Sequence, residues 1–159
     1  CEGTAYLLQT TGQNFLNNQK LSEEVFGPST LAISAANKEE LFSIAENLQG
    51  HLTATLICTG EDLEEFHSLV MILERKVGRL LINGFPTGVE VGNAMIHGGP
   101  FPATTDSRTT SVGTAAIYRF VRPVSYQDFP QQILPVELKN ENRLGIWRFI
   151  NGEFTKDKV

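Results

Sequence analysis

The chain has 159 residues, 41% of them hydrophobic, and a net charge of −5. This length is typical of one domain, and the apolar content is enough for a buried core. The acidic balance, with no basic run, argues against nucleic-acid binding, because neutralising phosphates needs clustered lysine and arginine. No apolar stretch approaches the roughly 20 residues that cross a bilayer. The N-terminus does not have the pattern of a signal peptide.

The two cysteines, Cys1 and Cys58, show no spacing typical of a zinc site or a disulfide framework. A reduced, cytoplasmic setting is the default for such a chain. Neither cysteine is predicted to be catalytic, because no neighbouring base is evident for either thiol. The three histidines share no metal-ligand spacing, so no metal site is predicted. The chain does not begin with methionine, which suggests a piece of a longer protein or a trimmed product.

The first part of the chain reads as a short strand at 4–10, a break at Gly12 and a polar loop at 14–20. Residues 22–28, Ser-Glu-Glu-Val-Phe-Gly-Pro, follow. They combine two carboxylates, an aromatic ring and a Gly-Pro turn. On local features alone, this stretch is an ordinary solvated helix start followed by a packed turn.

Strands and helices are then expected to alternate. The predicted elements are a strand at 29–34, a helix at 37–49, a strand at 53–58, a helix at 61–77 and a strand at 79–83. Asn37 is expected to cap the first helix in a capping box with Glu40. Gly50 and Gly78 are expected to end the two helices. This β-α-β-α-β order implies one parallel sheet with right-handed crossovers, with any chemistry at the carboxyl ends of its strands.

Residues 84–111 form a long glycine-rich stretch, whose prolines and aromatics favour an ordered loop with a function. His97 lies within it, on the carboxyl side of the third strand, and fits a structural role as well as a site. A short helix is predicted at 112–120. Strands are predicted at 121–126, where Pro123 allows only an edge or a bulge, and at 145–150.

Residues 23–28, Glu-Glu-Val-Phe-Gly-Pro, resemble the Glu-Glu-Ile/Val-Phe-Gly-Pro segment of the aldehyde dehydrogenase superfamily. Three later stretches resemble one branch, the α-ketoglutaric semialdehyde (2,5-dioxopentanoate) dehydrogenases and their NADP-dependent aldehyde dehydrogenase relatives. They are Ile-His-Gly-Gly-Pro-Phe-Pro-Ala-Thr at 96–104, Asp-Ser-Arg-Thr-Thr-Ser-Val-Gly at 106–113 and Arg-Phe-Val-Arg-Pro-Val-Ser-Tyr-Gln at 119–127. The first replaces the Pro-Phe-Gly-Gly-x-Lys-x-Ser-Gly loop of most members.

The resemblance implies an α/β fold that forms the C-terminal portion of such an enzyme. Residues 1–120 would be the rear of the catalytic domain, and 121–159 the oligomerisation strand and tail. The dinucleotide-binding domain, the nucleophilic cysteine and the general-base glutamate would lie upstream, outside this chain. The full-length enzyme would oxidise an aldehyde with NAD or NADP as a cytoplasmic homo-oligomer, and this chain alone would be inactive.

By the same resemblance, Glu24 matches the glutamate that binds the nicotinamide ribose, and Phe26 the aromatic that packs beside the nicotinamide. The residues assigned to the aldehyde pocket are Phe85, Pro86, Ile96 and His97, and those assigned to the oligomerisation strand are Arg122, Val124 and Tyr126. The expected partners are the aldehyde, the remainder of the enzyme and further copies of it, with no nucleic acid and no membrane. The alternative is a non-catalytic α/β assembly or binding module derived from this fold.

Overall fold

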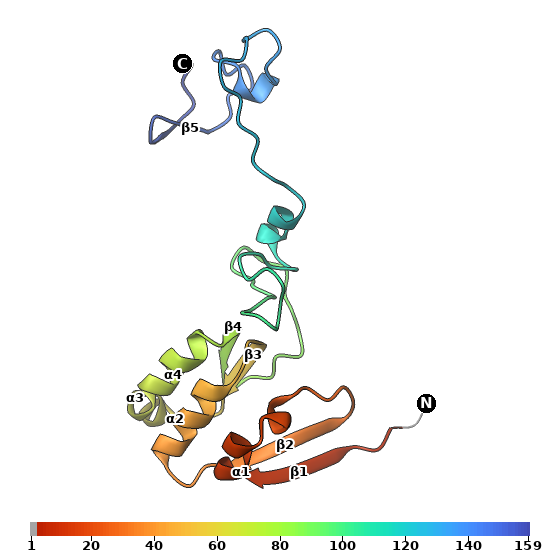
Figure 1. Cartoon of the computed structure of the whole chain (residues 1–159). Helices are drawn as coiled ribbons and strands as arrows, with labels where there is room; N and C mark the ends of the chain where they lie inside the picture. Colours follow the sequence, from red (N-terminus) through yellow and green to blue (C-terminus); the bar gives the residue numbers. More distant parts are fainter. Residues whose placement is uncertain (1–2) are drawn as a thin grey trace. The chain divides into compact units, whose positions relative to one another are not determined.

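The computed structural model describes residues 3–159 and divides the chain into two compact units, Cys1–Val121 and Arg122–Val159. Cys1, predicted not to be catalytic, lies outside the described residues. The elements of the first unit are β1 (Tyr6–Thr11), α1 (Gly12–Asn17), η1 (Gln19–Ser22), β2 (Ser29–Ser34), α2 (Lys38–Asn47), β3 (His51–Leu56), α3 (Gly60–Glu65), α4 (His67–Glu74), β4 (Val77–Ile82) and the 3-10 helix η2 (Thr114–Arg119) (Figure 1). No helix among the described residues is long and apolar enough to cross a membrane.

The strands form two separate two-stranded parallel sheets, β1–β2 and β3–β4. The predicted α/β class and parallel strand direction are confirmed. The prediction of one sheet through residues 29–34, 53–58 and 79–83 is wrong, because β2 takes β1 as its hydrogen-bonding neighbour instead of β3. Within each sheet, a helical segment still connects the two strands. In the second sheet this β-α-β unit leads from β3 through α3 and α4 to β4.

The short helix α1 replaces the loop predicted for this region. The Thr11 hydroxyl accepts a hydrogen bond from the Asn14 amide at 3.3 Å and caps the helix. Phe15 is only 5% exposed, so it anchors the helix. Gly12 does not simply break the strand. A Cβ there would lie 2.7 Å from the Glu40 carboxyl carbon, so glycine makes room for α2.

Helix α2 begins as predicted, because the Asn37 side chain accepts from the Glu40 amide at 2.8 Å. In the predicted capping box, the Glu40 carboxylate would accept a hydrogen bond from the Asn37 amide. It accepts from the Ala36 amide instead, one residue earlier. The helix ends at Asn47, with the Lys76 ammonium binding the carbonyls of Glu46 and Leu48 at 2.6 and 2.8 Å.

The helix predicted at 61–77 is two helices, because Phe66 leaves helical geometry (φ −102°, ψ 25°) between α3 and α4. Its ring packs edge-on against Phe42 at 6.4 Å and lies 4.5 Å from the Lys38 ammonium. These contacts orient the two helices against α2. The buried core beside this junction consists of Ala45, Leu69, Ile72 and Leu73. Apolar residues of β3 and β4 pack against it, so α2 and α4 cover the β3–β4 sheet.

The second unit contains the 3-10 helix η3 (Val136–Leu138) and an antiparallel hairpin of β5 (Arg148–Ile150) and β6 (Glu153–Thr155). The hairpin turns at Asn151 and Gly152, both with positive φ, and this Asn-Gly pair was a turn signal that the prediction did not use. The strand predicted at 145–150 is confirmed in its second half. Residues 121–126 form no strand and have no strand partner among 3–159, so the strand predicted there is wrong for this chain alone.

Candidate functional site

The segment that carries Glu24 and Phe26 is an exposed connection between η1 and β2. The Ser29 amide binds the Gly27 carbonyl at 2.8 Å, and the Pro28 carbonyl accepts from the Tyr6 amide at 2.9 Å. Gly27 has φ +144°, which favours glycine. Phe26 is 92% exposed, so its ring is available for a partner.

Glu24 lines a cleft of about 600 Å³ together with residues from the start of β3 and from the loop beyond His97. The lining residues include Glu23, Glu24, His51, Thr53, Pro102 and Ala103. Phe26 is not part of the lining. The fold therefore brings Glu24, but not Phe26, next to the glycine-rich loop.

Three glycines let that loop lie against the beginning of β3 and β4. A Cβ at Gly78 would overlap the Gly98 carbonyl, and one at Gly50 would overlap the Pro100 carbonyl. A Cβ at Gly99 would lie 2.5 Å from the His51 carbonyl oxygen. The prediction that Gly50 and Gly78 end helices is wrong. Gly78 lies inside β4, neither residue has positive φ, and both are needed for close backbone approach.

His97 is half-buried and its backbone is fixed on both sides. Its amide donates to the Thr110 hydroxyl at 2.8 Å, and its carbonyl accepts from the Ser111 amide and hydroxyl at 3.0 and 2.9 Å. The sequence placed this loop at the carboxyl ends of the strands. In the structure, residues 84–96 run back along β4, so Gly98 lies against Gly78, the second residue of that strand. The loop beyond His97 therefore lies at the beginning of β4 and not at its carboxyl end.

The other residues assigned to the pocket lie along this returning stretch. Phe85 is 85% exposed, and Pro86 is exposed with its carbonyl accepting from Arg79 at 3.2 Å. Ile96, 42% exposed, lines a second cleft of about 690 Å³ beside Arg79. Arg79 was missed from the sequence, although a single arginine in an otherwise apolar strand was a usable signal.

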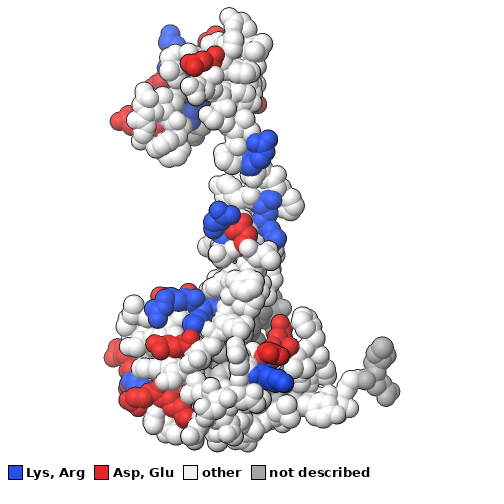
Figure 2. Space-filling model, viewed as in Figure 1, with Lys and Arg blue, Asp and Glu red and all other residues white. Residues whose placement is uncertain are grey.

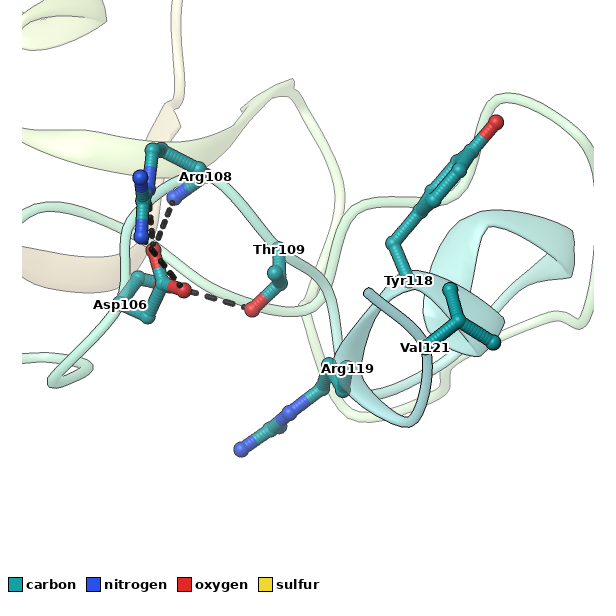
Figure 3. Close-up of a pocket in the computed structure, with 6 residues that line it drawn as sticks. All are labelled: Asp106, Arg108, Thr109, Tyr118, Arg119 and Val121. Carbon is teal, nitrogen blue, oxygen red and sulfur yellow. Dashed lines mark hydrogen bonds and ion pairs between the residues drawn. The ribbon is translucent and has the colours of Figure 1, made fainter. Parts of the chain in front are cut away.

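A third cleft, of about 570 Å³, is lined by Asp106 and Arg108 and by two residues of η2, Tyr118 and Arg119 (Figure 3). Arg108 binds Asp106 through two nitrogens, Nε to Oδ1 at 3.0 Å and Nη2 to Oδ2 at 3.3 Å. These bonds lower the pKa of Asp106 and raise that of Arg108. Tyr118 and Arg119 point away from the pair (Figure 3). The pair is exposed and two residues apart, so it orders a local turn.

Cys58 follows β3 and is held by Asn83, which follows β4. The Asn83 side chain accepts from the Cys58 amide and donates to its carbonyl, each at 2.8 Å. The half-buried thiol donates weakly to the Leu56 carbonyl at 3.9 Å. Within residues 3–159, no side-chain base is bonded to this thiol, and no three His, Cys, Asp or Glu side chains are grouped as a metal site requires.

The residues assigned to oligomerisation lie at the start of the second unit and are exposed. Tyr126 packs edge-on against Phe129 at 5.0 Å between ring centroids. Val124 is exposed, and Arg122 has no ion pair with any described residue. On the face shown in Figure 2, acidic and basic side chains are interspersed, with no extended surface of one sign.

Comparison with known proteins addresses the resemblance directly. The chain is 54% identical over 140 residues to alpha-ketoglutaric semialdehyde dehydrogenase from Acinetobacter baylyi, which covers 88% of this chain and 27% of that protein. It is 48% identical over 153 residues to alpha-ketoglutaric semialdehyde dehydrogenase 2 from Azospirillum brasilense, covering 96% of this chain and 29% of that protein. The predicted resemblance to these dehydrogenases is confirmed. The chain spans less than a third of the length of these relatives. No protein-family model matches the chain.

Proposed function

We propose that the full-length protein carrying this chain is an NAD(P)-dependent aldehyde dehydrogenase that converts α-ketoglutaric semialdehyde, or a related aldehyde, to its acid. The observation that carries this proposal is the 54% identity over 140 residues to a dehydrogenase of that name. In this proposal the chain is the C-terminal part, with 1–120 at the rear of the catalytic domain and 121–159 containing the oligomerisation strand.

The chemistry of Glu24 fits the ribose of a nicotinamide dinucleotide. A carboxylate accepts hydrogen bonds from two neighbouring hydroxyls, and Glu24 borders a cleft large enough for a sugar ring. The exposed ring of Phe26 can pack against a flat aromatic group. When bound, the nicotinamide supplies a hydride acceptor. Glu24 and Phe26 would orient it from this side of the site.

The pocket wall is the second contribution proposed for this chain. Phe85, Pro86, Ile96 and His97 would exclude water from the aldehyde and hold its chain, which favours a productive approach. The nucleophilic thiol and general base would come from the rest of the full-length protein, because this chain spans less than a third of the dehydrogenases that it matches. Among the described residues, no base is bonded to the Cys58 thiol.

The third contribution is the subunit contact. Residues 121–126 are exposed and carry no ladder hydrogen bonds within the described chain, so their backbone can pair with a strand of a second copy. Arg122, Val124 and Tyr126 would flank that pairing. Such pairing between copies would make the full-length protein a homo-oligomer.

Expression of the whole reading frame tests the proposal. The purified protein should form NADH or NADPH when supplied with α-ketoglutaric semialdehyde. Glu24→Gln keeps the side-chain shape but removes the charge, so the KM for the dinucleotide should rise about tenfold, the loss of one charged hydrogen bond. Glu64→Gln, exposed on α3, is the matched control. A folded oligomer with neither dinucleotide binding nor turnover would support the non-catalytic assembly module instead.

A further inference from the structure

Arg79 is a charged residue in the apolar strand β4, where it lies opposite Thr53 of β3. It is half-buried, and its Nε is fully buried. Burying a guanidinium costs free energy unless its donors find acceptors. The partners that this side chain does bind therefore identify what it stabilises.

Those partners are all in the loop that follows β4. Nη1 donates to the Gly88 carbonyl at 3.0 Å and lies 3.8 Å from the Met95 sulfur. Nη2 donates to the Pro86 carbonyl at 3.2 Å. One rigid guanidinium thus contacts two separate stretches of the loop, residues 86–88 through their carbonyls and Met95 through its sulfur.

The loop depends on this contact because it has little regular structure of its own. Residues 83–113, all of them described, contain neither helix nor strand. Between residues 90–96 and β4 lies the cleft of about 690 Å³ that Arg79, Glu90, Met95 and Ile96 line. Pro86 and Ile96 both belong to the proposed aldehyde pocket. Arg79 contacts the first stretch through the Pro86 carbonyl and the second through the sulfur of Met95, the neighbour of Ile96.

We infer that Arg79 is the positioning residue of the aldehyde pocket, holding the Pro86 and Ile96 stretches as one wall. This inference rests on the proposed function. It predicts that Arg79 acts on any aldehyde through the shape of the wall, and not through the charge of the substrate. The competing interpretation is that the Arg79 guanidinium, which lines this cleft, binds a substrate carboxylate directly.

Kinetics of the full-length protein separate the two. Arg79→Met and Arg79→Lys are compared on α-ketoglutaric semialdehyde and on pentanal, an uncharged aldehyde. Arg79→Met should lower kcat/KM about tenfold or more for both aldehydes, while the KM for the dinucleotide stays within about twofold. Arg79→Lys should fall between wild type and Arg79→Met, because an ammonium lacks the planar fork. A loss confined to the charged aldehyde, or no loss, would overturn the inference.

Hydrogen–deuterium exchange on the same full-length proteins tests the inference independently of activity. In Arg79→Met, peptides covering 86–96 should exchange several-fold faster than in wild type, with peptides of α2 and α4 unchanged. Arg75→Met is the matched control, since this exposed guanidinium has no hydrogen bond within the described chain. Equal exchange in 86–96 would refute the positioning role. If the wild-type protein oxidised no aldehyde, the proposed function would fail while this exchange result still decided the role of Arg79 in the loop.

Discussion

Gly78→Ala tests whether the contact between β4 and the His97 loop sets the geometry of the candidate site. A Cβ at position 78 would lie 2.5 Å from the Gly98 carbonyl carbon and 3.0 Å from the Gly99 nitrogen. Ordinary carbon–carbon contact is about 3.5 Å. The Gly98–Gly99 peptide must therefore retreat from β4 by roughly 1 Å. The neighbouring His97 backbone is tied to Thr110 and Ser111, so the shift strains these bonds too.

Overpacking of this kind typically costs about 1–3 kcal/mol, so the melting temperature of the full-length protein should fall. A displacement of about 1 Å in a substrate pocket can cost up to roughly a hundredfold in rate, and kcat/KM for the aldehyde should drop within that range. Differential scanning fluorimetry and steady-state kinetics measure the two effects. Gly60→Ala is the control, because a Cβ there meets nothing within 4 Å. A Gly78→Ala protein that matched the control in both measurements would refute the close-approach reasoning.

Two further predictions concern local bonds. Hydrogen bonds from Thr59 lower the pKa of Asp62 below its ordinary 3.8, so the carboxylate stabilises the fold above that pH and loses its effect as the pH falls through the lowered value. Melting curves from pH 7 to pH 3 should show wild type losing its advantage over Asp62→Asn on acidification, and a constant difference would contradict this. Asn83→Gly keeps the left-handed turn (φ 52°) but removes both bonds to Cys58. The Cys58 thiol should then react faster with Ellman's reagent, and an unchanged rate would show that Asn83 does not restrain it.

The local elements were predictable where short-range signals agreed. Residues 29–34 are strand as expected, and Asn37 caps α2 through the predicted bond. Helix α1 was missed because six residues are too few for a periodic pattern, and its stability comes from burying Phe15. The interruption at Phe66 depends on packing against Phe42, which lies on another helix. Such tertiary contacts leave no mark in a local window of sequence.

The candidate site was predictable only where a motif carried it. Glu24 was identified through the Glu-Glu-Val-Phe-Gly-Pro segment, and its assignment to a cofactor stays a prediction. Gly50 and Gly78 each come after a helix in the sequence, so the local pattern matched a helix end. Glycine is needed at both positions because the backbone of the distant loop 98–101 lies against them. The bonds of Arg79 form only after the loop folds back. Residues 121–126 remain irregular because a strand needs a neighbour to complete its hydrogen bonds.

Lys76 has a consequence for where the chain can change in length. Its ammonium binds the last carbonyls of α2, and its own carbonyl accepts from the His51 amide at 2.8 Å. The connection into β3 and the connection into β4 thus share one residue. An insertion between positions 48 and 50 would pull His51 or the end of α2 away from Lys76. Insertions should instead be tolerated at the exposed β5–β6 turn, where a Cβ on Gly152 would meet nothing within 4 Å, so relatives are expected to vary in length there and not at the entrance to β3.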